Sequence, residues 1–120
     1  MRFMVIRKAD KQTEAGVLPS KALLDAMGKF HEDGAKAGIV IDGTGLQPSS
    51  KGARVAFAGG KVTVTDGPFA ETKELIAGFT MIQAKSKEEA IAWVKQWPRL
   101  DGDVVLEIRQ LFEPEDFANI

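Results

Sequence analysis

Residues 79–109 read FTMIQAKSKEEAIAWVKQWPRLDGDVVLEIR, and the order of patterns in this stretch decides the fold. Phe79–Ala84 is a short apolar run, which is typical of a buried strand. A helix follows after Ser86 and stops at Pro98, because proline lacks the backbone N–H that a helix needs. Val104–Arg109 has an apolar residue at every second position, the pattern of a half-buried strand. The stretch therefore predicts a strand–helix–strand unit.

The predicted helix of this unit has a recognisable start and a buried face. Ser86 and Glu89 have the spacing of a capping box, in which each side chain satisfies a free backbone N–H at the first turn. Four apolar side chains recur at helical spacing and are expected to face the core: Ala90, Trp93, Val94 and Trp97. We interpret the two tryptophans as core residues rather than as a stacking platform for a ligand.

The N-terminal part of the chain follows the same order. Phe3–Ile6 predicts a strand. Ser20 can cap a helix whose apolar positions are Leu23, Leu24, Met27 and Phe30. We expect Gly34 and Gly38 to weaken the far end of this helix. Ile39–Ile41 predicts the next strand, and the glycines, proline and serines of residues 43–50 predict a loop.

A hairpin separates the two units. Arg54–Phe57 and Val62–Thr65 flank Gly59-Gly60, a pair that suits a tight turn between strands. The complete order predicts one α+β domain over residues 1–120 with a ferredoxin-like (split βαβ) antiparallel sheet, two helices on one face and a β-hairpin. Two helices cover only one face of such a sheet. The hairpin carries apolar side chains at Val55, Phe57, Val62 and Val64, so we expect a symmetric homodimer.

Composition excludes several classes of function. The 120 residues carry 16 Lys plus Arg against 17 Asp plus Glu, which gives no basic surface for nucleic acid or a membrane. Cysteine is absent and there is one histidine, so we expect no thiolate metal site and no cofactor held by such ligands. No run approaches the roughly 20 apolar residues of a membrane span, and no signal peptide is visible. We expect a cytoplasmic protein without metal or cofactor.

The most distinctive motif is Thr65–Glu74, with the sequence TDGPFAETKE. Asp66 can form an Asx turn, Pro68 stiffens the chain, and Phe69 could anchor the turn in the core. One helical turn near Glu74 would place carboxylates beside Lys73 at a rigid corner. The motif is either a well-built structural turn or a site in which Asp66 and Glu74 transfer protons while Pro68, Phe69 and Lys73 contact a ligand.

Two further side-chain types could take part in such a site. Arg54 and Arg109 lie on predicted strands, where each could bind an anionic ligand group or pair with a carboxylate such as Asp66 or Glu107. His31 lies one turn after Met27, on or beside the core-facing stripe of the first helix. It is a candidate catalytic residue, and the alternative is a packed or solvated residue at the helix edge.

The run Asp66–Phe69, continued through Phe79, resembles the signature of the DGPF-domain proteins within the YCII-related superfamily. Other matching segments lie on both sides: Ala37–Gly38, Gly45–Ser50, Gly52–Val55, Ser86–Ala90, Glu107–Arg109 and Glu113–Phe117. The resemblance covers nearly the whole chain and implies a dimeric ferredoxin-like α+β fold. Most members of that family have no established activity.

The resemblance also bears on chemistry and partners. In some YCII-related proteins a His–Asp pair has been proposed as catalytic, and one relative is a dehydrochlorinase of a chlorinated hydroxyquinol. Here His31 does not align with that histidine, and Asp42 is its nearest candidate partner. Many DGPF proteins have a histidine where this chain has Gln47, so any proton chemistry falls mainly to carboxylates. The family also resembles companions encoded beside extracytoplasmic-function sigma factors, which implies a possible functional link.

Three functions remain open from the sequence. The first is a small dimeric protein that binds a small molecule in a regulatory or accessory role. The second is a lyase- or isomerase-like enzyme in which Asp66 or Glu74 moves a proton and Arg54 binds an anionic substrate group. In the third, the turn serves only folding and dimerisation, with Pro68 and Phe69 in the dimer seam.

Overall fold

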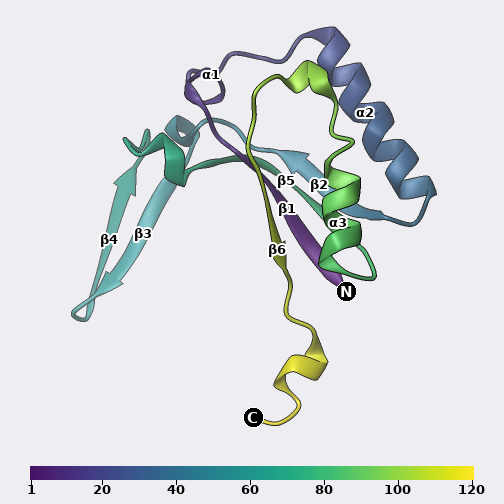
Figure 1. Ribbon diagram of the computed structural model, residues 1–120. Helices are drawn as coiled ribbons and strands as arrows, with labels where there is room; N and C mark the ends of the chain where they lie inside the picture. Colours follow the sequence, from purple (N-terminus) through teal and green to yellow (C-terminus); the bar gives the residue numbers. More distant parts are fainter.

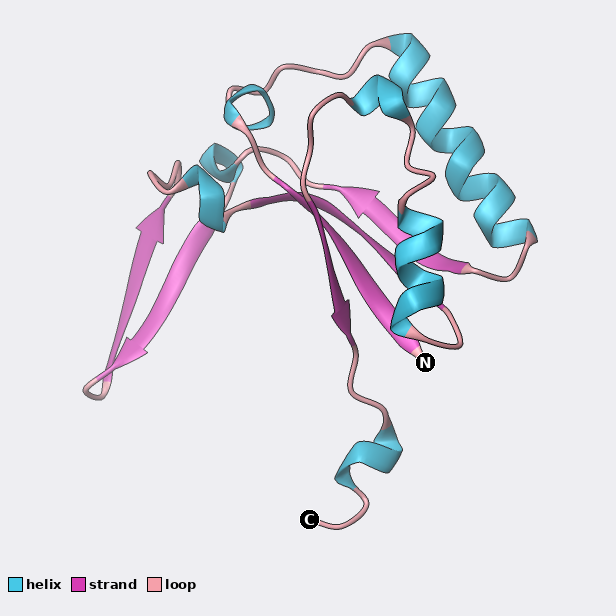
Figure 2. Cartoon of the chain, viewed as in Figure 1, coloured by secondary structure: helices cyan, strands magenta, loops and turns pink.

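The computed structural model describes residues 1–120 and confirms an α+β fold around a four-stranded antiparallel sheet (Figures 1 and 2). The strands lie in the order β2-β5-β1-β6, so the two strand–helix–strand units interleave as the split βαβ arrangement requires. The helices and strands are β1 (Arg2–Lys8), α1 (Lys11–Glu14), α2 (Lys21–Lys36), β2 (Val40–Gly45), β3 (Ala53–Ala58), β4 (Lys61–Asp66), β5 (Ile76–Gln83), α3 (Lys87–Val94) and β6 (Leu106–Gln110). Single 3-10 turns lie at Ser49–Lys51, Thr72–Glu74, Arg99–Asp101 and Pro114–Phe117.

The hydrophobic core lies between the sheet and helices α2 and α3, which share one face (Figure 1). Phe3 from β1, Ile82 from β5 and Trp93 from α3 are buried in it. Phe30 of α2 stacks on Trp93 with 4.5 Å between the ring centroids. The predicted core role of the helical aromatics is therefore confirmed. None of the helices has both the length and the apolar composition that a membrane crossing requires.

The opposite face of the sheet has no helix over it. Side chains alternate between the two faces of a strand, so the register pairs Ile6 with Phe79 and Met4 with Met81 on this open face. All four side chains are half-buried. An apolar stripe thus runs through the middle of the open face.

Helix starts were predicted correctly, whereas both helix ends differ from the sequence interpretation. The Ser20 and Ser86 side chains accept hydrogen bonds from the backbone N–H groups of Leu23 and Glu89. The Glu89 side chain does not accept the Ser86 N–H in return, so only half of the predicted capping box forms. Helix α3 ends at Val94 rather than at Pro98, although Trp97 still packs against the core. Helix α2 continues to Lys36 through Gly34, which is buried. A Cβ at Gly34 would lie 2.6 Å from Cγ2 of Val40, so this glycine permits close packing of α2 against β2.

The glycine loop predicted from residue 43 is part of a strand. Strand β2 runs through Gly43 to Gly45 and pairs with β5, and only the residues that follow it leave the sheet. A Cβ at Gly43 would lie 3.0 Å from the carbonyl oxygen of Phe79, and one at Gly78 would lie 2.9 Å from that of Thr44. The glycines therefore allow the backbones of β2 and β5 to approach closely.

The hairpin β3–β4 forms a separate two-stranded sheet that projects from the body, as the left side of Figure 2 shows. Gly59 and Gly60 have positive φ angles of 57° and 76°, which the tight turn needs. The predicted hairpin is confirmed. The Cα radius of gyration is 16.6 Å, compared with roughly 14 Å for a compact chain of this length. The projecting hairpin and the C-terminal segment after β6 account for this extended shape (Figure 1).

Candidate functional site

The two loops that carry the most distinctive sequence motifs meet at the root of the hairpin. Backbone N–H of Phe69 donates to Oγ of Ser49 at 3.0 Å, and N–H of Gly67 donates to the carbonyl of Gly52 at 3.0 Å. A Cβ at Gly67 would overlap the carbonyl of Ser49, because the two would be 1.8 Å apart. Only glycine fits at this position, so residues Pro48–Gly52 and Gly67–Phe69 form one interlocked unit.

Glu14 joins this unit from a distant part of the chain. Asp10 caps the single-turn helix α1 in a capping box with Thr13, and Glu14 is the last residue of that helix. Its Oε2 accepts the backbone N–H of Ser49 at 2.7 Å, across 35 positions in sequence. Its Oε1 is buried and has no hydrogen-bond donor. The sequence analysis missed Glu14, since no motif or spacing connects position 14 with position 49.

A cavity of about 320 Å³ opens beside this unit. Its apolar lining consists of Leu46, Phe69, Leu75 and Ile76. Glu14 and Lys51 are the charged residues that line it, and Gln47 adds an amide. Apolar walls with a few polar groups are the usual composition of a small-molecule site.

Arg54 packs on Phe69, which lines this cavity, but Arg54 is not itself one of the lining residues. Its guanidinium carbon is 3.9 Å from the centroid of the Phe69 ring, a cation–π contact. Arg54 forms no ion pair with a carboxylate, whereas Arg109 pairs with Glu107 at 3.4 Å. Phe69 is half-buried and lies outside the core cluster, so the expectation that it anchors the turn in the core is wrong. It supports Arg54 and lines the cavity instead.

The other residues of the predicted site are exposed. Asp66 ends β4, Pro68 follows it, and Lys73 and Glu74 lie in the 3-10 turn Thr72–Glu74. That turn confirms the predicted helical turn. None of these four residues lines the cavity or forms a side-chain hydrogen bond or ion pair, so the Asx turn predicted for Asp66 does not form. The structure therefore places Phe69 in the cavity lining, sets Arg54 on that ring outside the lining, and leaves the predicted proton-transfer carboxylates in solvent.

His31 lies on the helix side of the sheet, apart from this cavity. Its Nε2 is 2.7 Å from Oγ1 of the buried Thr80, and its Nδ1 is 2.9 Å from the carbonyl of Met27. The carbonyl can only accept, so Nδ1 carries the proton and Nε2 accepts from Thr80 in the neutral ring. Asp42 of β2 pairs with Met81 and therefore lies on the open face of the sheet. Its carboxylate accepts a hydrogen bond from the backbone N–H of Gly43. The sheet therefore separates His31 from Asp42, and they form no dyad.

An ion-pair network fixes the helix that supplies Glu14. Arg7 binds Asp101 through two contacts of 2.9 and 3.2 Å and also binds Asp10 at 3.1 Å. The indole N–H of Trp97 donates to Asp101 at 2.9 Å. The backbone N–H of Thr13 and the nearby Arg7 lower the pKa of Asp10, against the opposing effect of burial. Asp10 is thus held as a carboxylate that caps α1 and ties it to the sheet.

Comparison with known proteins agrees with this architecture. The 5-chloro-2-hydroxyhydroquinone dehydrochlorinase of Burkholderia phenoliruptrix AC1100, solved with 2,5-dihydroxybenzoquinone, has a similar fold with a TM-score of 0.53 and 15% sequence identity. The match covers 97% of this chain and 98% of that one. An uncharacterised protein of Rhizobium meliloti (strain 1021) is 35% identical over 72 residues. That match spans 60% of this chain and only 56% of the relative.

The family assignment comes from a match over most of the chain. The sequence pattern of the YCII-related domain fits residues 1–113, which include all the strands and helices and the candidate cavity. The segments that suggested this family from sequence alone lie almost entirely within that range. The chain therefore belongs to the YCII-related domain family.

Proposed function

We propose that this protein binds a small molecule in the cavity beside Phe69 and acts as a homodimer in a regulatory or accessory role. One observation carries the proposal: Arg54 is fixed over Phe69 with no carboxylate partner, beside a cavity of about 320 Å³. A guanidinium held in place by an aromatic ring is preorganised to bind an anionic group. Its N–H donors are free for a ligand because no protein carboxylate uses them.

The lining defines the class of ligand that would fit. Leu46, Leu75 and Ile76 suit an apolar body, and the Phe69 ring adds to this apolar wall. Lys51 adds a positive charge to the lining, and Glu14, whose Oε2 accepts the backbone N–H of Ser49, adds a carboxylate. We therefore propose a ligand that combines an apolar body with an anionic group. The proposal includes a functional link to an extracytoplasmic-function sigma factor. Through this link, binding of the ligand would regulate transcription.

The hairpin supports the homodimer. Val55, Phe57, Val62 and Val64 share one face of it, and between 54% and 79% of each side chain is exposed. A two-stranded hairpin is only marginally stable alone in water. An apolar face of this size on a projecting hairpin is typical of an association surface. We propose that a second copy of the chain covers this surface. In a symmetric dimer the apolar hairpin face would pack against the hairpin face or the open sheet face of the other copy.

A small-molecule enzyme is the second candidate. The similar fold belongs to a dehydrochlorinase, and Asp66 and Glu74 lie at the two ends of the turn that carries Phe69. A proton-transfer role requires these carboxylates to reach a bound ligand, and neither lines the cavity. Arg54 does not line it either, but its guanidinium packs on the Phe69 ring, which does. We therefore place this function second.

A thermal-shift screen of anionic metabolites tests the proposal. Compounds that stabilise the wild-type protein should fail to stabilise Arg54→Gln and should still stabilise Arg109→Gln, whose arginine is exposed and paired with Glu107. If no compound distinguishes Arg54→Gln from the wild type, the anion-binding role of Arg54 is wrong. Turnover of a bound compound that is lost in Asp66→Asn or Glu74→Gln would instead favour the enzyme. Recovery of a sigma factor with the tagged protein from cells would support the accessory role.

A further inference from the structure

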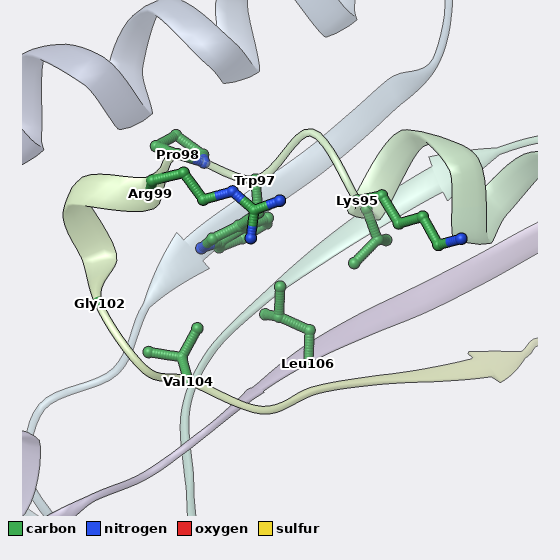
Figure 3. Close-up of a pocket in the computed structure, with 8 residues that line it drawn as sticks. Lys95, Trp97, Pro98, Arg99, Gly102, Val104 and Leu106 are labelled. Atoms are coloured by element: carbon green, nitrogen blue, oxygen red, sulfur yellow. The ribbon is translucent and has the colours of Figure 1, made fainter.

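A second cavity, of about 170 Å³, lies between the end of α3 and the start of β6 (Figure 3). It shares no lining residue with the cavity beside Phe69. Val94, Trp97, Val104 and Leu106 form its apolar walls. In Figure 3 the side chains of Val104 and Leu106 point toward the Trp97 ring from the opposite side.

The size of this cavity suits one small ring or branched chain. An apolar cavity of about 150 Å³ is large enough to hold benzene, whereas one water occupies about 30 Å³. The volume of about 170 Å³ is therefore large enough for one such ring. The lining presents polar and apolar surface in nearly equal amounts, so an occupant with both an apolar body and a polar group is favoured.

The charged side chains that line this cavity are all positive. Arg99 and Lys95 are the charged residues among those that line it, and neither forms an ion pair. Figure 3 shows the guanidinium of Arg99 directed toward Trp97, whereas the Lys95 ammonium points away along α3. Arg99 is therefore the cation available to an occupant, and its planar fork matches a carboxylate.

The wall that carries Trp97 is fixed by the ion-pair network. The indole N–H donates to Asp101, and Arg7 binds both carboxylate oxygens of Asp101. Arg7 already balances the charge of Asp101, so that carboxylate does not neutralise Arg99. The cavity thus has an aromatic wall that is fixed before any ligand binds, which lowers the entropic cost of binding, and the exposed Arg99 supplies an unpaired cation.

We propose that this second cavity is a binding site for a small carboxylate with an apolar body, in which Arg99 holds the carboxylate and Trp97, Val104 and Leu106 enclose the apolar part. The site is separate from the cavity beside Phe69 and does not depend on the function proposed there.

An NMR titration with benzoate tests the proposal, with benzyl alcohol as the uncharged probe. Benzoate should shift the indole N–H signal of Trp97 saturably and bind about tenfold more tightly than benzyl alcohol, because a charge-assisted bidentate pair is lost in the alcohol. The buried Trp93 provides an internal reference signal. In Arg99→Gln the affinity for benzoate should fall to that of benzyl alcohol, and in Lys95→Gln it should stay within about twofold of the wild type.

A cavity-filling variant separates the apolar part from the charge. Val104→Phe should abolish binding of both probes, whereas Arg99→Gln should remove only the preference for the carboxylate. Equal affinities for the two probes, or equal losses in Lys95→Gln and Arg99→Gln, would overturn the proposed role of Arg99. Absence of a shift at Trp97, or shifts confined to the amides of Ser49 and Phe69, would overturn the site itself.

Discussion

Two glycines of helix α2 should respond in opposite directions to the same substitution. Gly28 and Gly34 are both helical, and alanine stabilises a helix by about 1 kcal/mol relative to glycine. A Cβ at Gly28 would meet nothing within 4 Å. We expect Gly28→Ala to raise the free energy of unfolding by about 0.5–1 kcal/mol.

At Gly34 the same methyl group would enter a packed interface. It would lie 2.6 Å from Cγ2 of Val40 and 3.3 Å from Cζ2 of Trp93, well inside the optimal carbon–carbon separation of about 3.5–4.0 Å. Overpacking of this kind costs about 1–3 kcal/mol, and Val40 is β-branched and cannot easily rotate away. The cost offsets or exceeds the helix gain, so Gly34→Ala should be less stable than Gly28→Ala by about 1–3 kcal/mol.

Urea unfolding followed by tryptophan fluorescence measures this difference. All variants are compared at one protein concentration, since the stability of a dimer depends on it. Adding Val40→Ala removes the contacting methyl group, so the double variant Gly34→Ala/Val40→Ala should be more stable than the sum of the single changes. Equal stabilities of Gly28→Ala and Gly34→Ala would refute the close approach of α2 to β2 and Trp93.

Three further outcomes follow from the structure. Replacing Phe57 with lysine should shift the protein to a monomer in analytical ultracentrifugation, since it charges the apolar face of the hairpin; an unchanged dimer would exclude this face as the interface. The ionised Asp10 has a lowered pKa, so its stabilising effect is present above the unfolded value of about 3.8 and disappears as the pH falls through the lower folded value. The unfolding free energy of Asp10→Asn should accordingly vary less with pH in this acidic range, as acid titrations monitored by circular dichroism can show. Gly67→Ala forces the two motif loops apart, and backbone amide exchange at Phe69 should accelerate while exchange in β1 stays slow.

Local signals were enough to predict the strands of both units, the two longer helices and their order, but not the single-turn helix α1 or the end of β2. The serine caps of α2 and α3, the glycine turn of the hairpin and the apolar alternation of the strands each depend on neighbours within a few residues. Backbone hydrogen bonding and side-chain periodicity act at that range, so the sequence alone predicted the interleaved sheet and, through its motifs, the YCII-related family.

The candidate site was only partly predictable. The sequence pointed to Arg54 and Phe69, but it placed Phe69 in the core and favoured Asp66 and Glu74, which the fold leaves in solvent. Glu14 could not be found, because its contact with Ser49 depends on the path of the chain between α1 and the hairpin.

The sequence by itself determined the main strands, the two longer helices and the hairpin turn, since these follow from interactions between neighbours along the chain. Only the tertiary structure decided what each glycine does: Gly34 permits close packing against Val40, and Gly43 permits the close approach of two strands. The same structure separated His31 from Asp42 by placing them on opposite faces of one sheet. The physical reason is that steric contact and hydrogen bonding act through distances in space, and residues far apart in sequence come within that distance only after folding.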